Sequence, residues 1–143
     1  MKHKFLTGIF ATTVAIATIM PAMAGVVEDR QAKFKANNLS MRTIGAAIGA
    51  GDTATIKAEA SKIAEWAKVM PDYFPEGSNP PNASVKDDLW DNFDLFVKQA
   101  DDNYQAAQAL IAVANSDDRD KIVGALRAMG GTCKACHQNF KSF

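Results

Sequence analysis

A seven-residue recurrence of apolar side chains constrains the fold of this chain more than any other feature of its sequence. Two series share the interval: Val27, Phe34, Met41 and Ile48, then Ile56, Ile63 and Met70. Seven residues are close to two turns of an α-helix, so each series lies along one side of a helix as an apolar seam. Helices of this kind bury their seams against each other, and the pattern therefore predicts a helical bundle.

Helix-ending residues divide the first half of the chain. The first helix is expected over residues 26–50 and ends at Gly51. Asp52 or Thr53 then caps a second helix, because either side chain can accept a hydrogen bond from the backbone of the first turn. Pro71 is expected to end that second helix.

A proline-rich segment, residues 71–83, is the one long loop that the sequence predicts. Ser84 is expected to cap a third helix, with Asp87 completing an approximate capping box, and the polar stretch 115–118 separates it from a fourth. The inner face of the third helix is predicted to hold Leu89, Phe93, Phe96, Ala100, Ala107, Leu110 and Ala114. The inner face of the fourth is predicted to hold Ile122, Leu126, Met129, Cys133, Cys136, Phe140 and Phe143. We therefore expect an all-α, antiparallel four-helix bundle.

The N-terminus has the pattern of an export signal. Residues 2–4 are basic, residues 5–20 are uncharged and largely apolar, and Pro21 precedes the small-x-small sequence of residues 22–24. We predict that residues 1–24 are a cleaved signal peptide, and that residues 25–143 form a single periplasmic domain. The apolar run is short for a membrane anchor.

Charge and composition exclude two classes of partner for the mature chain. The predicted signal holds two of the 16 Lys and Arg residues and none of the 16 Asp and Glu residues, which leaves the remainder slightly acidic. A nucleic-acid or membrane-surface protein would carry a basic patch or stripe. We therefore expect no nucleic-acid partner and no membrane association after signal cleavage.

Cys133, Cys136 and His137 form the sequence Cys-x-x-Cys-His close to the end of the chain. On a helix, residues three and four positions apart lie on the same face, so both thiols and the imidazole point to one side. Cys-x-x-Cys-His is the attachment signature of c-type haem, whose two vinyl groups react with the thiols while the imidazole binds the iron. We predict one covalent haem c, attached through Cys133 and Cys136, with His137 as the axial iron ligand.

Three other interpretations of the two cysteines are weaker. A thioredoxin-type pair needs a preceding strand, and no strand pattern precedes Cys133. A structural zinc site needs four ligands, and after signal cleavage only His137 and the two cysteines remain unless Asp or Glu completes the set. A disulfide between Cys133 and Cys136 would close a loop too short to stabilise the fold.

The chain after the predicted signal resembles the cytochrome c′ family, the four-helix class of c-type cytochromes. The resemblance depends on the attachment motif at the C-terminal end and on Arg30 and Gln31 early in the first helix. Trp90 at the start of the third helix fits as well, as does a basic residue, Lys141, four positions after His137.

The resemblance also implies a role for Phe34. In the family, the residue three positions after the Arg-Gln pair faces the iron opposite the histidine. A phenyl ring donates no lone pair, so Phe34 implies five-coordinate iron that binds nitric oxide, and also carbon monoxide. Phe34 is also one residue of the apolar seam, and both roles can hold. A methionine ligand would instead give a six-coordinate, low-spin carrier; Met41 lies about 10 Å further along the helix, and Met70 and Met129 fit core positions.

Five further residues are placed at the haem by the resemblance. Lys141 would lie on the proximal side, although a cation near a helix C-terminus is favourable without a further role. Arg30 and Gln31 would bind the propionates, while Ser78 and Asn79 lie in the loop that borders the haem. The alternative for Arg30 is an exposed position on a polar helix face.

These residues favour an electron-transfer protein, not an enzyme. A peroxidase needs a distal base, and the one histidine outside the predicted signal is assigned to the iron. The expected partners are redox proteins and a small gas. A homodimer through the first two helices is also implied by the resemblance, with Ile44 or Ala46 as outward apolar contacts.

Overall fold

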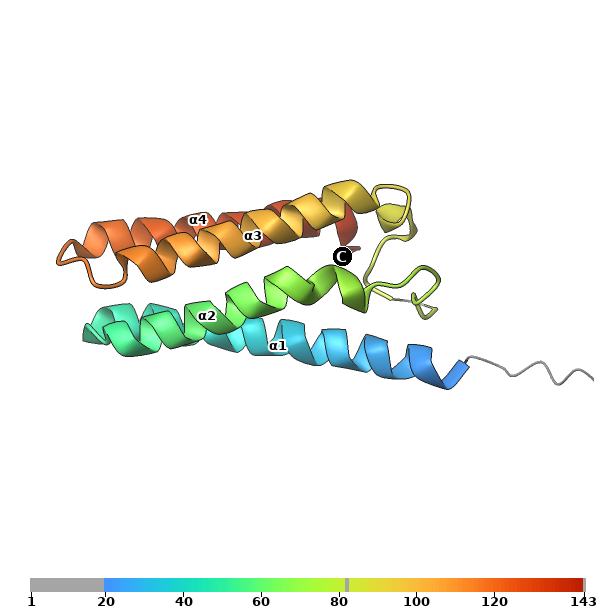
Figure 1. Ribbon diagram of the computed structural model, residues 1–143, viewed down its shortest axis with the longest axis horizontal. Helices are drawn as coiled ribbons and strands as arrows, with labels where there is room; N and C mark the ends of the chain where they lie inside the picture. The colour runs from blue at the N-terminus through green and yellow to red at the C-terminus, as the bar shows by residue number, and fades with distance from the viewer. Residues whose placement is uncertain (1–19, 82, 143) are drawn as a thin grey trace, which may run out of the picture.

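The computed structural model describes residues 20–81 and 83–142, which form four long helices (Figure 1). Between α2 and α3 the chain also forms two short 3-10 helices, η1 and η2. The elements in chain order are α1 (Met20–Ala50), α2 (Thr53–Val69), η1 (Met70–Tyr73), η2 (Asp87–Leu89), α3 (Phe93–Val113) and α4 (Arg119–Phe140). Within the described residues, the one β-type pairing is an isolated bridge between Val85 and Lys141. The prediction of an all-α four-helix bundle is confirmed.

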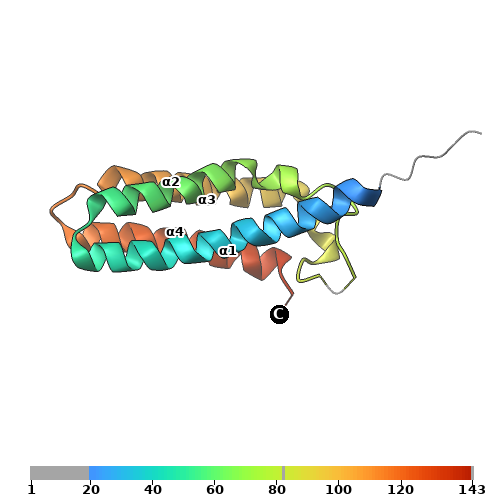
Figure 2. The same ribbon diagram turned by 90° about the horizontal axis from the view of Figure 1, so that it is seen from below.

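The four helices lie side by side as two antiparallel hairpins, α1–α2 and α3–α4 (Figures 1 and 2). Helix α2 packs extensively against both α1 and α3, and α3 packs against α4, whereas α1 and α4 make the weakest contact among neighbouring helices. The α1–α4 side, which runs along the bottom of the bundle in Figure 2, is therefore the open side of the bundle.

The predicted signal peptide falls mostly on residues 1–19, outside the described residues. Residues 20–24 continue α1 towards the N-terminus as helical backbone, so this helix begins earlier than the sequence pattern indicated. None of the described helices has a stretch of the length and apolarity needed to cross a membrane.

The predicted ends of the first two helices are found. Gly51 has a φ of 71°, which favours glycine, and ends α1. Asp52 caps α2 by accepting a hydrogen bond of 3.0 Å from the Thr55 amide. Helix α2 ends at Val69, just before Pro71, and Pro71 lies in the first turn of η1, where its missing N–H has no partner to lose.

The predicted start of the third helix is wrong. Helix α3 begins at Phe93, after the cap position Asn92, and not directly after Ser84. Residues 84–86 run antiparallel to the end of α4: the Ser142 amide donates to the Ser84 carbonyl (2.9 Å), and the Lys86 amide donates to the Phe140 carbonyl (3.0 Å). Backbone groups that pair with a distant segment cannot also make helical hydrogen bonds, so this segment, 83–86, forms a strap across the bundle end.

Two apolar clusters fill the interior. One surrounds the middle of the bundle and includes Ile44, Ile63 and Leu110. The other lies below the strap and includes Trp66 and Phe140. Ile44 has no exposed surface, so its predicted role as an outward dimer contact is wrong, because the seam of α1 turns it into the core.

Shortening a core side chain of α3 is expected to destabilise the bundle strongly. Leu110 is fully buried, and Leu110→Ala should lower the free energy of unfolding by about 2–5 kcal/mol through lost burial and a residual cavity. Leu95, on the same helix, is 42% exposed, and Leu95→Ala should cost about 0.5 kcal/mol. Denaturant unfolding of both variants checks this, and equal losses would contradict the assignment of the core.

Candidate functional site

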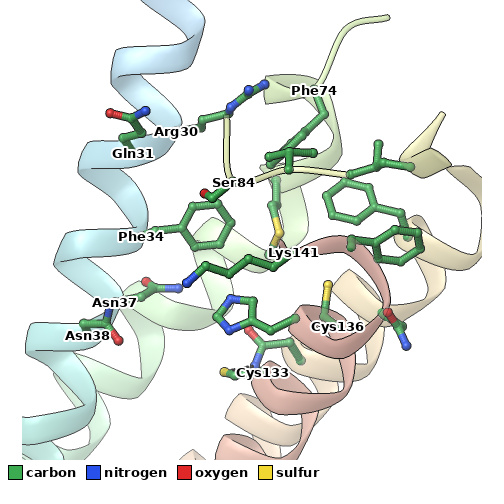
Figure 3. A pocket seen from close by; sticks show the side chains of 18 of the residues that line it. Arg30, Gln31, Phe34, Asn37, Asn38, Phe74, Ser84, Cys133, Cys136 and Lys141 are labelled. Atoms are coloured by element: carbon green, nitrogen blue, oxygen red, sulfur yellow. Dashed lines mark hydrogen bonds between the residues drawn. The ribbon is translucent and has the colours of Figure 1, made fainter. Parts of the chain in front are cut away.

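A cavity of about 330 Å³ opens at the end of the bundle where α1 and α4 separate. Its walls come from the N-terminal halves of α1 and α3, the last turns of α4 and the strap (Figure 3). The weak α1–α4 contact therefore marks the place where the bundle is hollow.

Cys133, Cys136 and His137 all line this cavity from the last two turns of α4. All three are partly buried, and both thiols are free. The motif lies inside α4, and none of the described residues before it forms a strand of a sheet, which argues against the thioredoxin arrangement. Among the described residues, no three His, Cys, Asp or Glu side chains cluster closely enough to hold a metal ion, and this excludes the zinc alternative there.

Burial sets the protonation of the three groups. It raises the pKa of the Cys136 thiol to about 11, and the nearby Cys133 adds to that shift. Burial also raises the pKa of Cys133, although its polar neighbours Thr132 and Asn103 oppose that rise. The pKa of His137 is lowered, mainly by burial and secondarily by the charge of Lys141. A neutral imidazole has a free lone pair, which is the form that binds a metal.

Phe34 stands on α1 across the cavity from His137. Their ring centroids are 6.4 Å apart, and Phe34 also makes edge contacts with Trp66 (5.5 Å) and Phe74 (6.4 Å). Phe34 therefore belongs to the apolar seam and to the cavity wall at once, as the sequence analysis allowed. A phenyl ring offers no metal-binding atom.

Two methionines also line the cavity, Met41 and Met70. Met70 is buried in the cluster below the strap. The Met41 methyl group lies 3.6 Å from where a Cβ at Gly130 would stand, so the absence of a side chain there gives Met41 room against α4.

Arg30 is buried, with 3% of its surface exposed, so the alternative of a solvated position is wrong. Its guanidinium donates to the Ser78 hydroxyl (2.9 Å) and carbonyl (3.3 Å), and lies 4.6 Å from the centroid of the Phe74 ring. Burial lowers the pKa of this guanidinium. No carboxylate forms an ion pair with Arg30 among the described residues.

The loop residues Ser78 and Asn79 are not among those that line the cavity. Ser78 binds Arg30 behind the cavity, and the Asn79 amide donates to Val85 and Asp87 at 3.0 Å each. The strap, which includes Ser84 and Val85, supplies the lining of the cavity instead. Ser78 and Asn79 therefore support the residues that meet a guest, and their predicted place at the haem edge stays a prediction.

Gln31 and Lys141 line the cavity as expected. Gln31 is an exposed residue of α1, and the Lys141 side chain extends from the end of α4 towards α1 (Figure 3). The sequence analysis missed four amide side chains that also line it: Asn37, Asn38, Gln99 and Asn103. A signal existed for Asn103, which stands between Ala100 and Ala107 in the otherwise apolar stripe of α3.

The residues present fit haem c. Two thiols and an imidazole share one face of α4, aromatic rings supply a flat apolar wall, and Arg30 offers a buried positive charge to a propionate. The Gln99 carbonyl oxygen is buried at this cavity without a hydrogen-bond partner, which indicates that the protein alone does not satisfy the polar groups of the cavity.

Comparison with known proteins agrees with this chemistry. The family model described as Cytochrome C′ matches residues 25–141. The chain belongs to the cytochrome c′ family. It is therefore a c-type cytochrome, of a family whose members bind haem for electron transfer and are not classical enzymes.

Individual relatives extend over nearly the whole chain. A cytochrome c′ of Rhodospirillum rubrum is 32% identical over 96% of this chain and 93% of its own length. A cytochrome c-556 of Agrobacterium fabrum is 34% identical over 99% and 97%. The solved cytochrome c′ of Thermochromatium tepidum has a TM-score of 0.75 at 27% identity, and the match covers 85% of this chain and 97% of that one.

Proposed function

We propose that this family member is a periplasmic mono-haem cytochrome whose iron is five-coordinate and binds nitric oxide. Haem c, attached through Cys133 and Cys136, supplies an iron that changes between ferric and ferrous states and holds a gas at its open position. His137 supplies the one protein ligand, Arg30 and Gln31 hold the acidic groups, and the aromatic wall excludes water.

The placement of Phe34 opposite His137 carries the proposal. A ligand set that ended in a second imidazole or a thioether would serve electron transfer alone. Phe34 instead presents a ring that leaves the distal position open and admits only small, weakly polar molecules. Nitric oxide and carbon monoxide have that size and polarity.

The absorption spectrum of the purified protein, ferric and ferrous, before and after nitric oxide, tests the proposal. We expect a high-spin spectrum that changes when nitric oxide is added. A low-spin spectrum with the far-red band of a methionine–iron bond would overturn the five-coordinate assignment. Absence of any haem spectrum, from a host able to attach haem, would refute haem binding altogether.

A six-coordinate electron carrier is the second candidate function. Met41 and Met70 both line the cavity, and either thioether would serve as a sixth ligand if its helix moved closer to the iron. The spectrum just described decides between the two candidates.

A haem peroxidase is less well supported. Such chemistry needs a base beside the distal position, and Phe34 stands on that side. We expect no turnover of peroxide with a dye reductant beyond that of free haem.

The predicted signal peptide supports a periplasmic location and redox proteins there as partners. Homodimer formation through α1 and α2 remains part of the proposal. Ala46 is exposed on α1, and Leu39 of the same helix is 58% exposed. One solved cytochrome c′, 25% identical with a TM-score of 0.75, is described as showing ligand-controlled dimer dissociation, which is consistent with a gas-sensitive dimer.

A further inference from the structure

Asn103 is a buried amide at a position where the pattern of α3 calls for an apolar residue. Only 5% of its surface is exposed, and it follows Ala100 and precedes Ala107 on the inner face of the helix. Burying an amide costs free energy unless its polar atoms are satisfied, so the contacts of Asn103 need an explanation.

Those contacts all lead to α4, at the attachment motif. The Asn103 Nδ2 group donates to the Thr132 hydroxyl at 2.8 Å and to the Cys133 Sγ at 3.5 Å. The Thr132 hydroxyl donates its own hydrogen to the Met129 carbonyl at 2.7 Å. Since that hydroxyl already donates, it can only accept from Asn103, and this fixes the NH₂ end of the amide towards α4.

The two cysteines are therefore unequal. Cys133 receives a hydrogen bond from a side chain of another helix, whereas Cys136 has no such donor among the described residues. A sulfur held by a donor keeps one side-chain orientation, and it also shares some electron density with that donor.

We propose that Asn103 is a positioning residue for Cys133, whose Nδ2–H orients the sulfur for haem attachment and then remains hydrogen-bonded to the thioether. This rests on the proposed covalent attachment. Attachment adds the Cys133 S–H across one vinyl C=C bond, with sulfur bonded to one carbon and hydrogen to the other, so no oxidant or reductant is consumed.

The proposal has two measurable consequences. Loss of orientation should leave part of the protein attached through Cys136 alone. Loss of the donor returns electron density to the sulfur at the haem edge, which disfavours the ferrous state and lowers the reduction potential, since hydrogen bonds near a cofactor tune its potential.

The test compares Asn103→Leu, which keeps the volume and removes the donor, with Thr132→Val. Thr132→Val is the control, because it removes the Thr132 hydroxyl, which accepts from the Asn103 amide, and leaves the Asn103 hydrogen bond to Cys133 in place. In Asn103→Leu, we expect the ferrous–ferric equilibrium constant to fall about two- to fivefold, the effect of about one modest hydrogen bond. The control should keep the parent potential.

The pyridine haemochrome spectrum provides the second readout. Addition releases no atoms, so singly and doubly attached proteins have the same mass, but the haemochrome band reports how many vinyl groups remain. A larger singly attached fraction in Asn103→Leu than in Thr132→Val supports the proposal. If Asn103→Leu fails to fold, Asn103→Ala removes the donor without adding volume or charge and should show the same two changes.

Two results would overturn the proposal. One is a parent-like potential and haemochrome in Asn103→Leu, and the other is an equal change in both variants, which would indicate a packing role. Failure of the proposed function is distinguishable, because it would appear as an absence of covalent haem in the unmutated protein.

Discussion

In the double variant Cys133→Ser, Cys136→Ser, haem is expected to leave the protein completely on denaturation. A serine hydroxyl does not add to a vinyl group under conditions where a thiol does. Both cysteines line the cavity on the face of α4 that also carries His137, so nothing else in that face can replace the covalent bonds. Mass spectrometry of the denatured chain should show the mass of haem on the parent and none on the variant.

Ala135→Ser is the matched control. Ala135 lies between the two cysteines and is exposed, so this change places the same hydroxyl in the same helical turn without touching a thiol. The control should keep its haem through denaturation. Covalent haem on the double variant would contradict attachment through Cys133 and Cys136.

Phe34→Met is expected to convert the iron from high spin to low spin. The substitution places a thioether on α1 where the ring now lies 6.4 Å from the His137 ring, centroid to centroid. A far-red methionine–iron band should appear in the ferric absorption spectrum. Nitric oxide should bind more than about tenfold more slowly, because the iron–sulfur bond has to break first, and 1.4 kcal/mol of added barrier is tenfold in rate.

Phe34→Leu is the control for Phe34→Met. It also replaces the ring, but leucine is apolar and offers no lone pair to the iron. That variant should keep the parent spin state, and the smaller side chain should speed the entry of nitric oxide. A far-red band in the parent itself would mean that a cavity methionine already binds the iron, and comparison of Met41→Leu with Met70→Leu would then identify it.

The sequence was informative wherever a local pattern decides the structure. Gly51 and Asp52 separate α1 from α2 through their own backbone and side-chain chemistry. The spacing of Cys133, Cys136 and His137 puts them on one helical face whatever surrounds the helix. These features need no knowledge of distant residues, and they were predictable.

Features that depend on residues far apart in the chain were not predictable. Ser84 has the local signature of a helix cap, but its carbonyl accepts from Ser142, 58 positions later. Arg30 looks like a surface residue on a helix, and only its contacts with Ser78 and Phe74 show that it is buried. Tertiary contacts overrode the local preference in both places.

Asn103 is a third kind of feature, because its position in the sequence indicated a role that the pattern analysis did not recognise. An amide between Ala100 and Ala107 interrupts an apolar stripe, and a buried amide has to have partners. The sequence could show that partners were needed, but it could not show that they would be Thr132 and Cys133.

The limited contact between α1 and α4 has a consequence for kinetics. The attachment residues belong to the α3–α4 hairpin, whereas Phe34 and Arg30 belong to the α1–α2 hairpin. Since α2 and α3 pack extensively and α1 and α4 do not, we expect small rotations of one hairpin against the other about the α2–α3 contact to widen the Phe34 side of the cavity. The rate of gas entry would then depend on how often the α1–α4 side of the bundle opens. Amide hydrogen exchange along α1 would report the same motion.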